Sequence, residues 1–175
     1  MVKVIMHGCN GKMGQVITRL AAADPEMEIV AGVDMRAQAL NDYPVFGDIG
    51  ECGVEADVVI DFSNAAAVDR LLDWCGEKQM PVVLCTTGLS EEQLSKVEET
   101  AKKTALLKSA NMSLGVNLLM KLLQDAAKVL APEGFDMEIV ERHHNQKVDA
   151  PSGTAIALAD SLKEALEEDY AYVYD

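Results

Sequence analysis

The chain has 175 residues, of which 49% are hydrophobic and 25% charged, and its formal net charge is −14. This length accommodates one compact domain and part of a second. The negative charge argues against nucleic acid or an anionic membrane as a partner, and no apolar stretch approaches the length of a membrane span. We therefore predict a globular protein that binds neither nucleic acid nor membrane.

Cysteine usage and the N-terminus predict a cytoplasmic location. The four cysteines lie in mostly apolar surroundings and lack a disulfide framework, which is typical of a reducing compartment. The first six residues run directly into a strand pattern, without the apolar region and cleavage site of a signal peptide.

Residues 2–110 alternate between short β-branched runs and amphipathic helical stretches, the pattern of a parallel sheet covered by helices. The predicted strands are residues 2–6, 28–33, 58–62, 81–85 and 105–107. The predicted helices are residues 12–23, residues 65–75 ended by Gly76, and a helix that starts with a capping box at Ser90–Gln93 and runs to about Lys103.

The pattern changes after Asn111. Ser113 is expected to cap a long helix that runs to Leu130 and is closed by Pro132 and Gly134. A strand at residues 137–140 and a helix from about Thr154 to Glu168 follow, and residues 170–175 alternate like the start of another strand. A single helix–strand pair cannot bury its own apolar faces, so this second part is expected to be an incomplete α+β domain.

A glycine-rich segment directly follows the first predicted strand and opens the first helix. Its glycines fall at positions 8, 11 and 14, as in the phosphate-binding turn of dinucleotide folds, where backbone N–H groups and a helix N-terminus face a pyrophosphate. We predict an α/β fold whose N-terminal part, residues 1–112, is a Rossmann-like dinucleotide-binding domain. The cofactor contacts predicted in this segment are Gly8, Asn10, Gly11, Lys12, Met13 and Gly14.

Asp34 ends the second predicted strand, twenty residues after Gly14, where an acidic side chain accepts hydrogen bonds from the adenosine ribose. A 2′-phosphate would meet this negative charge, which favours NADH. Arg36 could instead pair with that phosphate or stack on adenine, and Lys12 could add positive charge, so both NADH and NADPH stay open as cofactors.

Thr86, Thr87 and Gly88 follow a later strand at its carboxyl end, where ligands bind in open α/β sheets. By position they should border the nicotinamide ribose. The alternative is an ordinary Thr-Thr-Gly turn.

The segment from Glu138 to Ala155 gathers groups suited to protonating a small carboxylated substrate. Two adjacent histidines can exchange a proton near neutral pH, a lysine adds positive charge, and Ser-Gly-Thr ahead of a helix offers N–H groups to an anion. The alternative is a surface histidine pair followed by a simple helix start. A zinc site is not supported, because the third histidine, His7, is distant and no ligand spacing fits, so no metal is predicted.

In this order, the glycine turn, Thr-Thr-Gly and His-His-x-x-Lys-x-Asp-x-Pro-Ser-Gly-Thr resemble the dihydrodipicolinate reductase (4-hydroxy-tetrahydrodipicolinate reductase) family over essentially the whole chain. The resemblance implies reduction of a cyclic dicarboxylate to tetrahydrodipicolinate by NADH or NADPH in lysine and diaminopimelate biosynthesis. It implies that His143 donates the proton and that Lys147 meets a substrate carboxylate or assists protonation. It also implies substrate contacts at His144, Ser152, Gly153 and Thr154.

Residues 109–113 resemble the hinge of that family, whose backbone lies near the nicotinamide, so Asn111 and Met112 are expected to contact the cofactor. This chain has Ala110 where the family often has proline. Residues 113–175 are then expected to form the substrate-binding and catalytic domain.

Members of the family continue well past residue 175, and the additional part supplies further strands of the substrate domain and much of the contact in a homotetramer. The chain is therefore expected to be truncated. Two alternatives stay open: a truncated dinucleotide-binding module without full catalytic activity, and another amino-acid-pathway dehydrogenase with a similar nucleotide domain.

Overall fold

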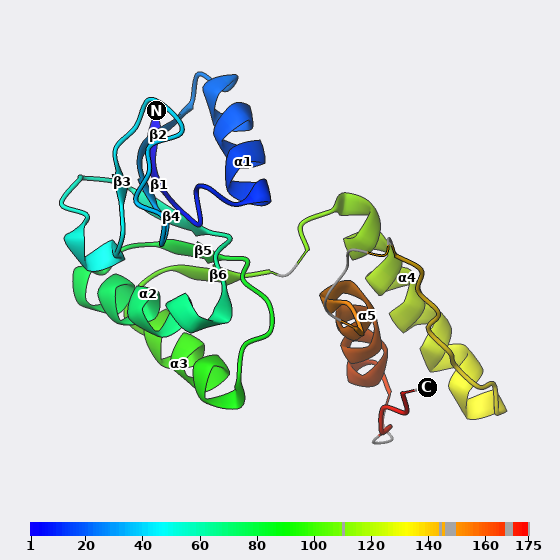
Figure 1. Cartoon of the computed structure of the whole chain (residues 1–175). Coiled ribbons are helices and arrows are strands. Elements are labelled where there is room, and N and C mark those ends of the chain that lie inside the picture. The colour runs from blue at the N-terminus through cyan, green and yellow to red at the C-terminus, as the bar shows by residue number, and fades with distance from the viewer. Residues whose placement is uncertain (110, 144, 146–149, 167–169, 175) are drawn as a thin grey trace. The chain divides into compact units, whose positions relative to one another are not determined.

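The structure is a computed structural model that describes all residues except 110, 144, 146–149, 167–169 and 175. The chain divides into two compact units, residues 1–109 and residues 110–175 (Figure 1).

The first unit is built on a six-stranded sheet in which every strand pairing is parallel. The strands lie in the order β3-β2-β1-β4-β5-β6, which confirms the predicted α/β fold. Their bounds are β1 Val2–His7, β2 Met27–Val33, β3 Val45–Phe46, β4 Val58–Asp61, β5 Val82–Leu84 and β6 Leu106–Lys108. The direction of the strand order reverses between β1 and β4, and this topological switch point is where open α/β sheets bind ligands.

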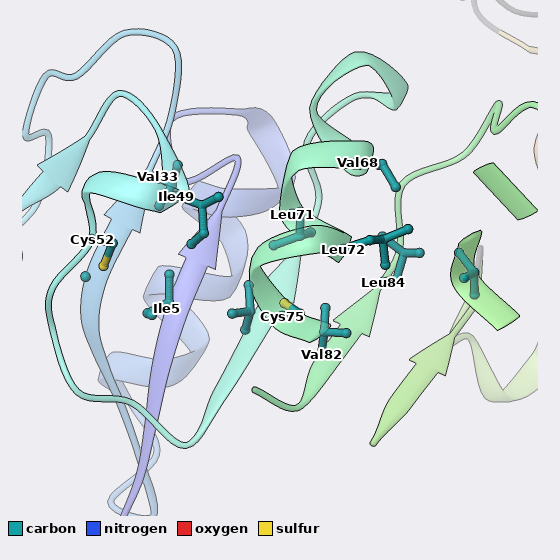
Figure 2. Close-up of a cluster of buried hydrophobic side chains, with 13 residues drawn as sticks. Ile5, Val33, Ile49, Cys52, Val68, Leu71, Leu72, Cys75, Val82 and Leu84 are labelled. Carbon is teal, nitrogen blue, oxygen red and sulfur yellow. The ribbon is translucent and has the colours of Figure 1, made fainter. Parts of the chain in front are cut away.

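Helices cover both faces of this sheet because successive strand residues point to opposite sides. Ile5 belongs to a buried cluster with Leu71 and Leu72 of the helix α2 (Figure 2). The next residue, Met6, packs with Ile17 of the helix α1 on the other face. The helices and the 3-10 turn of this unit are α1 Lys12–Ala22, α2 Ala65–Lys78, α3 Glu91–Ala101 and η1 Ile49–Glu51.

The predicted capping box at the start of α3 is confirmed, with Gln93 N donating to Ser90 Oγ and the Gln93 side chain accepting from Ser90 N. The predicted end of α2 at Gly76 is wrong. The helix continues to Lys78 and ends at Gln79, which takes the left-handed conformation with a φ of 52°. A glycine inside a helix lowers helix stability by only about 1 kcal/mol relative to alanine, so packing against the sheet is enough for the helix to continue beyond Gly76.

The second unit contains α4 (Leu114–Leu130), the 3-10 turn η2 (Ala131–Glu133) and α5 (Gly153–Glu164). Ser113 caps α4 by accepting a hydrogen bond from Val116 N, as predicted, and α4 packs against α5. Gly134 follows η2 with a φ of 81°, and α5 ends at Glu164 rather than near Glu168.

The strand predicted at residues 137–140 and the strand start at residues 170–174 are wrong for the residues that the structure describes. A strand is defined by backbone pairing with a neighbour, and no strand is present among the described residues of this unit. Val140 is accordingly 84% exposed. In the described part of the chain we find no helix whose length and apolar character would let it cross a bilayer.

Candidate functional site

The glycine turn after β1 is packed so closely that a side chain is excluded at two of its glycines, Gly8 and Gly14. Gly8 has a φ of +80°, and a Cβ on it would lie 2.5 Å from the Phe62 carbonyl oxygen. A Cβ on Gly14 would lie 2.3 Å from the Gly8 carbonyl oxygen and 2.6 Å from that of Cys9. The turn therefore folds back against the start of α1, and two of its three glycines are required by close backbone approach.

The same turn presents backbone donors at the N-terminus of α1. Gly11 is the N-cap residue and lacks a side chain to cap the helix, and the first turn contains no acidic residue. The first intrahelical bond is donated by Gln15 N to Gly11 O at 3.0 Å. The N–H groups of Lys12, Met13 and Gly14 therefore have no intrahelical acceptor, and with the helix dipole they favour an anion.

Asp34 lies beside this turn, immediately after β2. Its Oδ2 accepts from Asn10 N at 3.2 Å and its Oδ1 accepts from Arg36 N at 3.0 Å. The Asn10 side chain donates to the carbonyls of Arg36 and Gln38, at 2.9 and 3.0 Å. The structure thus brings together the residues predicted at the adenosine end of a dinucleotide. Each carboxylate oxygen keeps a second lone pair that could accept from a ribose hydroxyl.

A buried polar cluster at the same sheet edge was missed by the sequence reasoning. Asp61, the fully buried last residue of β4, accepts hydrogen bonds at 2.6 Å from His7 Nδ1, Ser63 Oγ and Thr86 Oγ1. Burial raises the pKa of Asp61, but the hydrogen bonds from His7, Ser63 and Thr86 outweigh it and the pKa is lowered below its ordinary value. The available signal was an acidic residue at the end of an otherwise apolar strand.

The predicted Thr-Thr-Gly contact follows β5 at this edge. Thr86 is buried, whereas Thr87 and Gly88 are exposed. Gly88 has a φ of +73°, and a Cβ on it would meet no atom within 4 Å. The glycine is therefore favoured by its backbone conformation, and the space next to it is open.

In the second unit, the start of α5 is organised by hydrogen bonds from three segments. Ser152 Oγ caps the helix by accepting from Ala155 N at 3.1 Å, and Ser152 N donates to Glu141 Oε1 at 2.7 Å. Asn111 Nδ2 donates to Thr154 Oγ1 at 3.1 Å. Glu141, which was not predicted as a site residue, also places Oε2 3.5 Å from His143 Nδ1.

The remaining predicted site residues divide into three groups. Gly153 is the first residue of α5. Four of the predicted cofactor contacts are exposed to solvent: Lys12, Met13, Arg36 and Met112. His144 and Lys147 lie outside the described residues, so their predicted roles stay predictions. Among the described residues, no group of three or more His, Cys, Asp or Glu side chains is arranged to hold a metal ion.

The four cysteines are free and buried, and none contributes a reactive thiol to the sheet edge. Burial raises the pKa of Cys9 and of Cys85 to about 11, with further increases from the charges of Asp34 and Asp61 respectively. These thiols are therefore protonated at neutral pH and pack as small apolar groups.

Two family models match the chain. The model described as dihydrodipicolinate reductase, N-terminus, matches residues 2–112, and the model described as dihydrodipicolinate reductase, C-terminus, matches residues 115–172.

Among curated relatives, the 4-hydroxy-tetrahydrodipicolinate reductase of Caldanaerobacter subterraneus subsp. tengcongensis is 54% identical over 174 residues, covering 99% of this chain and 68% of the relative. The enzyme of the same name from Clostridium tetani is 49% identical with the same coverage. The chain therefore spans about two thirds of the length of these relatives.

A solved structure, dipicolinate-bound dihydrodipicolinate reductase from Paenisporosarcina sp. TG-14, matches with a TM-score of 0.76 and 30% identity, covering 94% of this chain and 66% of that one. Sequence relatives, both family models and a solved structure thus agree over nearly the whole chain. The chain belongs to the dihydrodipicolinate reductase family.

Proposed function

We propose that this protein reduces a cyclic dicarboxylate, 4-hydroxy-tetrahydrodipicolinate or dihydrodipicolinate, to tetrahydrodipicolinate with NADH or NADPH, in lysine and diaminopimelate biosynthesis. The observation that carries the proposal is the tight glycine turn at the switch point, with Asp34 beside it, in a chain of this family. A bound NADH or NADPH supplies the hydride. The protein residues bind both molecules, orient them and supply the proton.

Residues 1–112 are proposed to bind the dinucleotide and residues 113–175 to contribute to the substrate domain. In the first domain, the turn N–H groups bind the pyrophosphate and Asp34 binds the adenosine ribose. In the second, the Ser152–Thr154 segment and Lys147 hold a substrate carboxylate and His144 completes the substrate contacts, whereas Asn111 and Met112 at the hinge contact the cofactor. Such positioning of substrate supplies much of the rate in reactions of this kind.

The direct test uses the purified chain with reduced nicotinamide nucleotide and freshly generated substrate. Substrate-dependent loss of the absorbance of NADH or NADPH is the expected result. Nucleotide binding without that loss would instead support the alternative, a truncated dinucleotide-binding module. Turnover of a different substrate, found by screening, would support the other alternative, that the chain is another amino-acid-pathway dehydrogenase with a similar nucleotide domain.

Replacing His143 by glutamine is expected to lower kcat by about 10²–10⁴-fold, the usual contribution of a general acid, while NADH binding is unchanged. The His143 side chain is 41% exposed and lies 3.5 Å from Glu141, so glutamine can be accommodated without disturbing a core. Steady-state kinetics and NADH titration measure the two effects. Arg142→Gln, at the exposed neighbouring position, is the matched control, and equal turnover of His143→Gln and wild type would remove the acid role.

Asp34 and Arg36 are expected to set the cofactor preference. Hydrogen bonds from a ribose diol to the Asp34 carboxylate contribute roughly 1.5–3 kcal/mol each, and a 2′-phosphate replaces them with repulsion. NADH should therefore bind at least as tightly as NADPH, and Arg36→Ala should weaken NADPH binding by about tenfold more than NADH binding. Calorimetric titration of both cofactors measures this, with Arg19→Ala in the last turn of α1 as the control. Equal losses for the two cofactors would place Arg36 away from the phosphate.

The other partners follow from the same proposal. We infer a cytoplasmic enzyme that acts on a small dicarboxylate and has no nucleic-acid or membrane partner, in keeping with the net charge of −14. The homotetramer implied by the resemblance is tested by light scattering on the purified chain.

A further inference from the structure

The buried pair of His7 and Asp61 lies at the switch point of the sheet. His7 is the last residue of β1 and Asp61 is the last residue of β4, and the two are direct register partners in the parallel pairing. Gly8, the first glycine of the nucleotide turn, follows His7 at once. The pair therefore lies directly beneath the edge at which an open α/β sheet binds its ligand.

Asp61 determines where the hydrogen atoms of three neighbours point. An ionised carboxylate only accepts hydrogen bonds, so His7 must carry its proton on Nδ1, and the hydroxyl groups of Ser63 and Thr86 must both donate to Asp61. Ser63 Oγ also lies 3.5 Å from the Asn64 carbonyl, but the 2.6 Å bond to the charged Asp61 is much the stronger of the two.

A hydroxyl group has one hydrogen and two lone pairs. Because the hydroxyl groups of Ser63 and Thr86 both donate their one hydrogen bond to Asp61, the two oxygens can only accept a hydrogen bond from any further partner. They lie 3.4 Å apart, so they form a pair of neighbouring acceptors after β4 and β5. Such a pair favours ligand groups that donate hydrogen bonds and disfavours phosphate, which only accepts.

We propose that Asp61 and His7 are positioning residues that hold the Ser63 and Thr86 hydroxyls as hydrogen-bond acceptors for the nicotinamide-ribose half of the dinucleotide. The inference rests on the proposed function. The two ends of the nucleotide site then have opposite polarity: N–H donors in the glycine turn bind the pyrophosphate, and hydroxyl acceptors bind the ribose hydroxyls or the carboxamide N–H of the other half. This polarity fixes the direction in which the dinucleotide lies along the sheet edge.

The test compares ligands that contain or lack the half in question. NADH, ADP-ribose and ADP are titrated by calorimetry against wild type, Asp61→Asn and Thr86→Val. Both variants should bind NADH about tenfold more weakly, the loss of one hydrogen bond, and should bind ADP as wild type does. A parallel loss for ADP-ribose assigns the contact to the ribose hydroxyls, and a loss for NADH alone assigns it to the carboxamide.

Conservative variants separate positioning from simple loss of structure. Thr86→Ser keeps the hydroxyl and should restore NADH affinity, and His7→Asn keeps a donor for Asp61 whereas His7→Leu does not. Thr100→Val, at a buried threonine of α3, is the matched control for hydroxyl removal. If Asp61→Asn does not fold, the comparison of Thr86→Ser with Thr86→Val and that of His7→Asn with His7→Leu test the same proposal.

The outcomes distinguish the two proposals. Equal losses for NADH and ADP, or no loss for either, would overturn the positioning role and leave the proposed function intact. A wild-type chain that binds neither NADH nor ADP would overturn the proposed function itself.

Discussion

Replacing Gly14 by alanine is expected to abolish measurable NADH binding. The added Cβ would lie 2.3 Å from the Gly8 carbonyl oxygen and 2.6 Å from that of Cys9, so backbone rather than a flexible side chain must move. That movement displaces the N–H groups that face the pyrophosphate. Overpacking of this kind also costs about 3 kcal/mol of unfolding free energy. NADH titration and chemical denaturation measure the two effects.

The matched control is Gly76→Ala, because Gly76 is also a helical glycine of the first unit. Its Cβ would lie 3.4 Å from Lys103 Cδ, in the middle of a flexible side chain that can shift. Alanine has the higher helix propensity, so this variant should gain about 0.5–1 kcal/mol and bind NADH normally. NADH affinity in Gly14→Ala that equals that of Gly76→Ala would mean that the turn does not hold the cofactor.

Replacing Asp61 by asparagine is expected to lower the free energy of unfolding more than the other proposed substitutions do, and to change how that free energy depends on pH. The carboxylate is fully buried and accepts three side-chain hydrogen bonds, so its loss leaves His7 and two hydroxyls incompletely paired. Removing one partner of a buried pair costs about 3–5 kcal/mol. Urea denaturation at neutral pH measures this loss.

The pH dependence follows from the direction of the Asp61 pKa. Because the folded-state pKa is lowered relative to the unfolded value of about 3.9, the stabilisation is fully present above that value. It is lost as the pH falls through the folded-state pKa, since both states then bind the proton. Wild type should therefore lose stability below about pH 4 more steeply than Asp61→Asn.

Asp48→Asn is the control for this second prediction. The pKa of Asp48 is also lowered, chiefly by its hydrogen bond from Arg70, but this ion pair is exposed to solvent. Its removal should change stability far less at neutral pH, because water screens exposed pairs. Identical acid profiles for Asp61→Asn and wild type would show that the folded-state pKa of Asp61 is not lowered.

Local patterns in the sequence determined most of the first unit. Strand-like blocks separated by amphipathic helices predicted a parallel sheet, and the six parallel strands confirm it. The Ser90–Gln93 capping box and the Ser113 cap were also predictable, because a cap depends on residues within one helical turn. Gly14 was recognisable for the same reason, since the Gly8 and Cys9 carbonyls that exclude a Cβ there belong to the same turn, whereas the carbonyl that excludes a Cβ at Gly8 is that of Phe62, remote along the chain.

The tertiary structure decided the features that depend on distant residues. The Asp61 cluster joins residues from the ends of β1, β4 and β5, and 54 positions separate His7 from Asp61, so no spacing rule could connect them. The short strand β3 is defined only by its pairing with β2, and residues 137–140 have strand-like composition but no strand partner among the described residues. Helix caps and tight turns are fixed by near neighbours along the chain, whereas strand pairing and buried polar clusters exist only once remote segments meet.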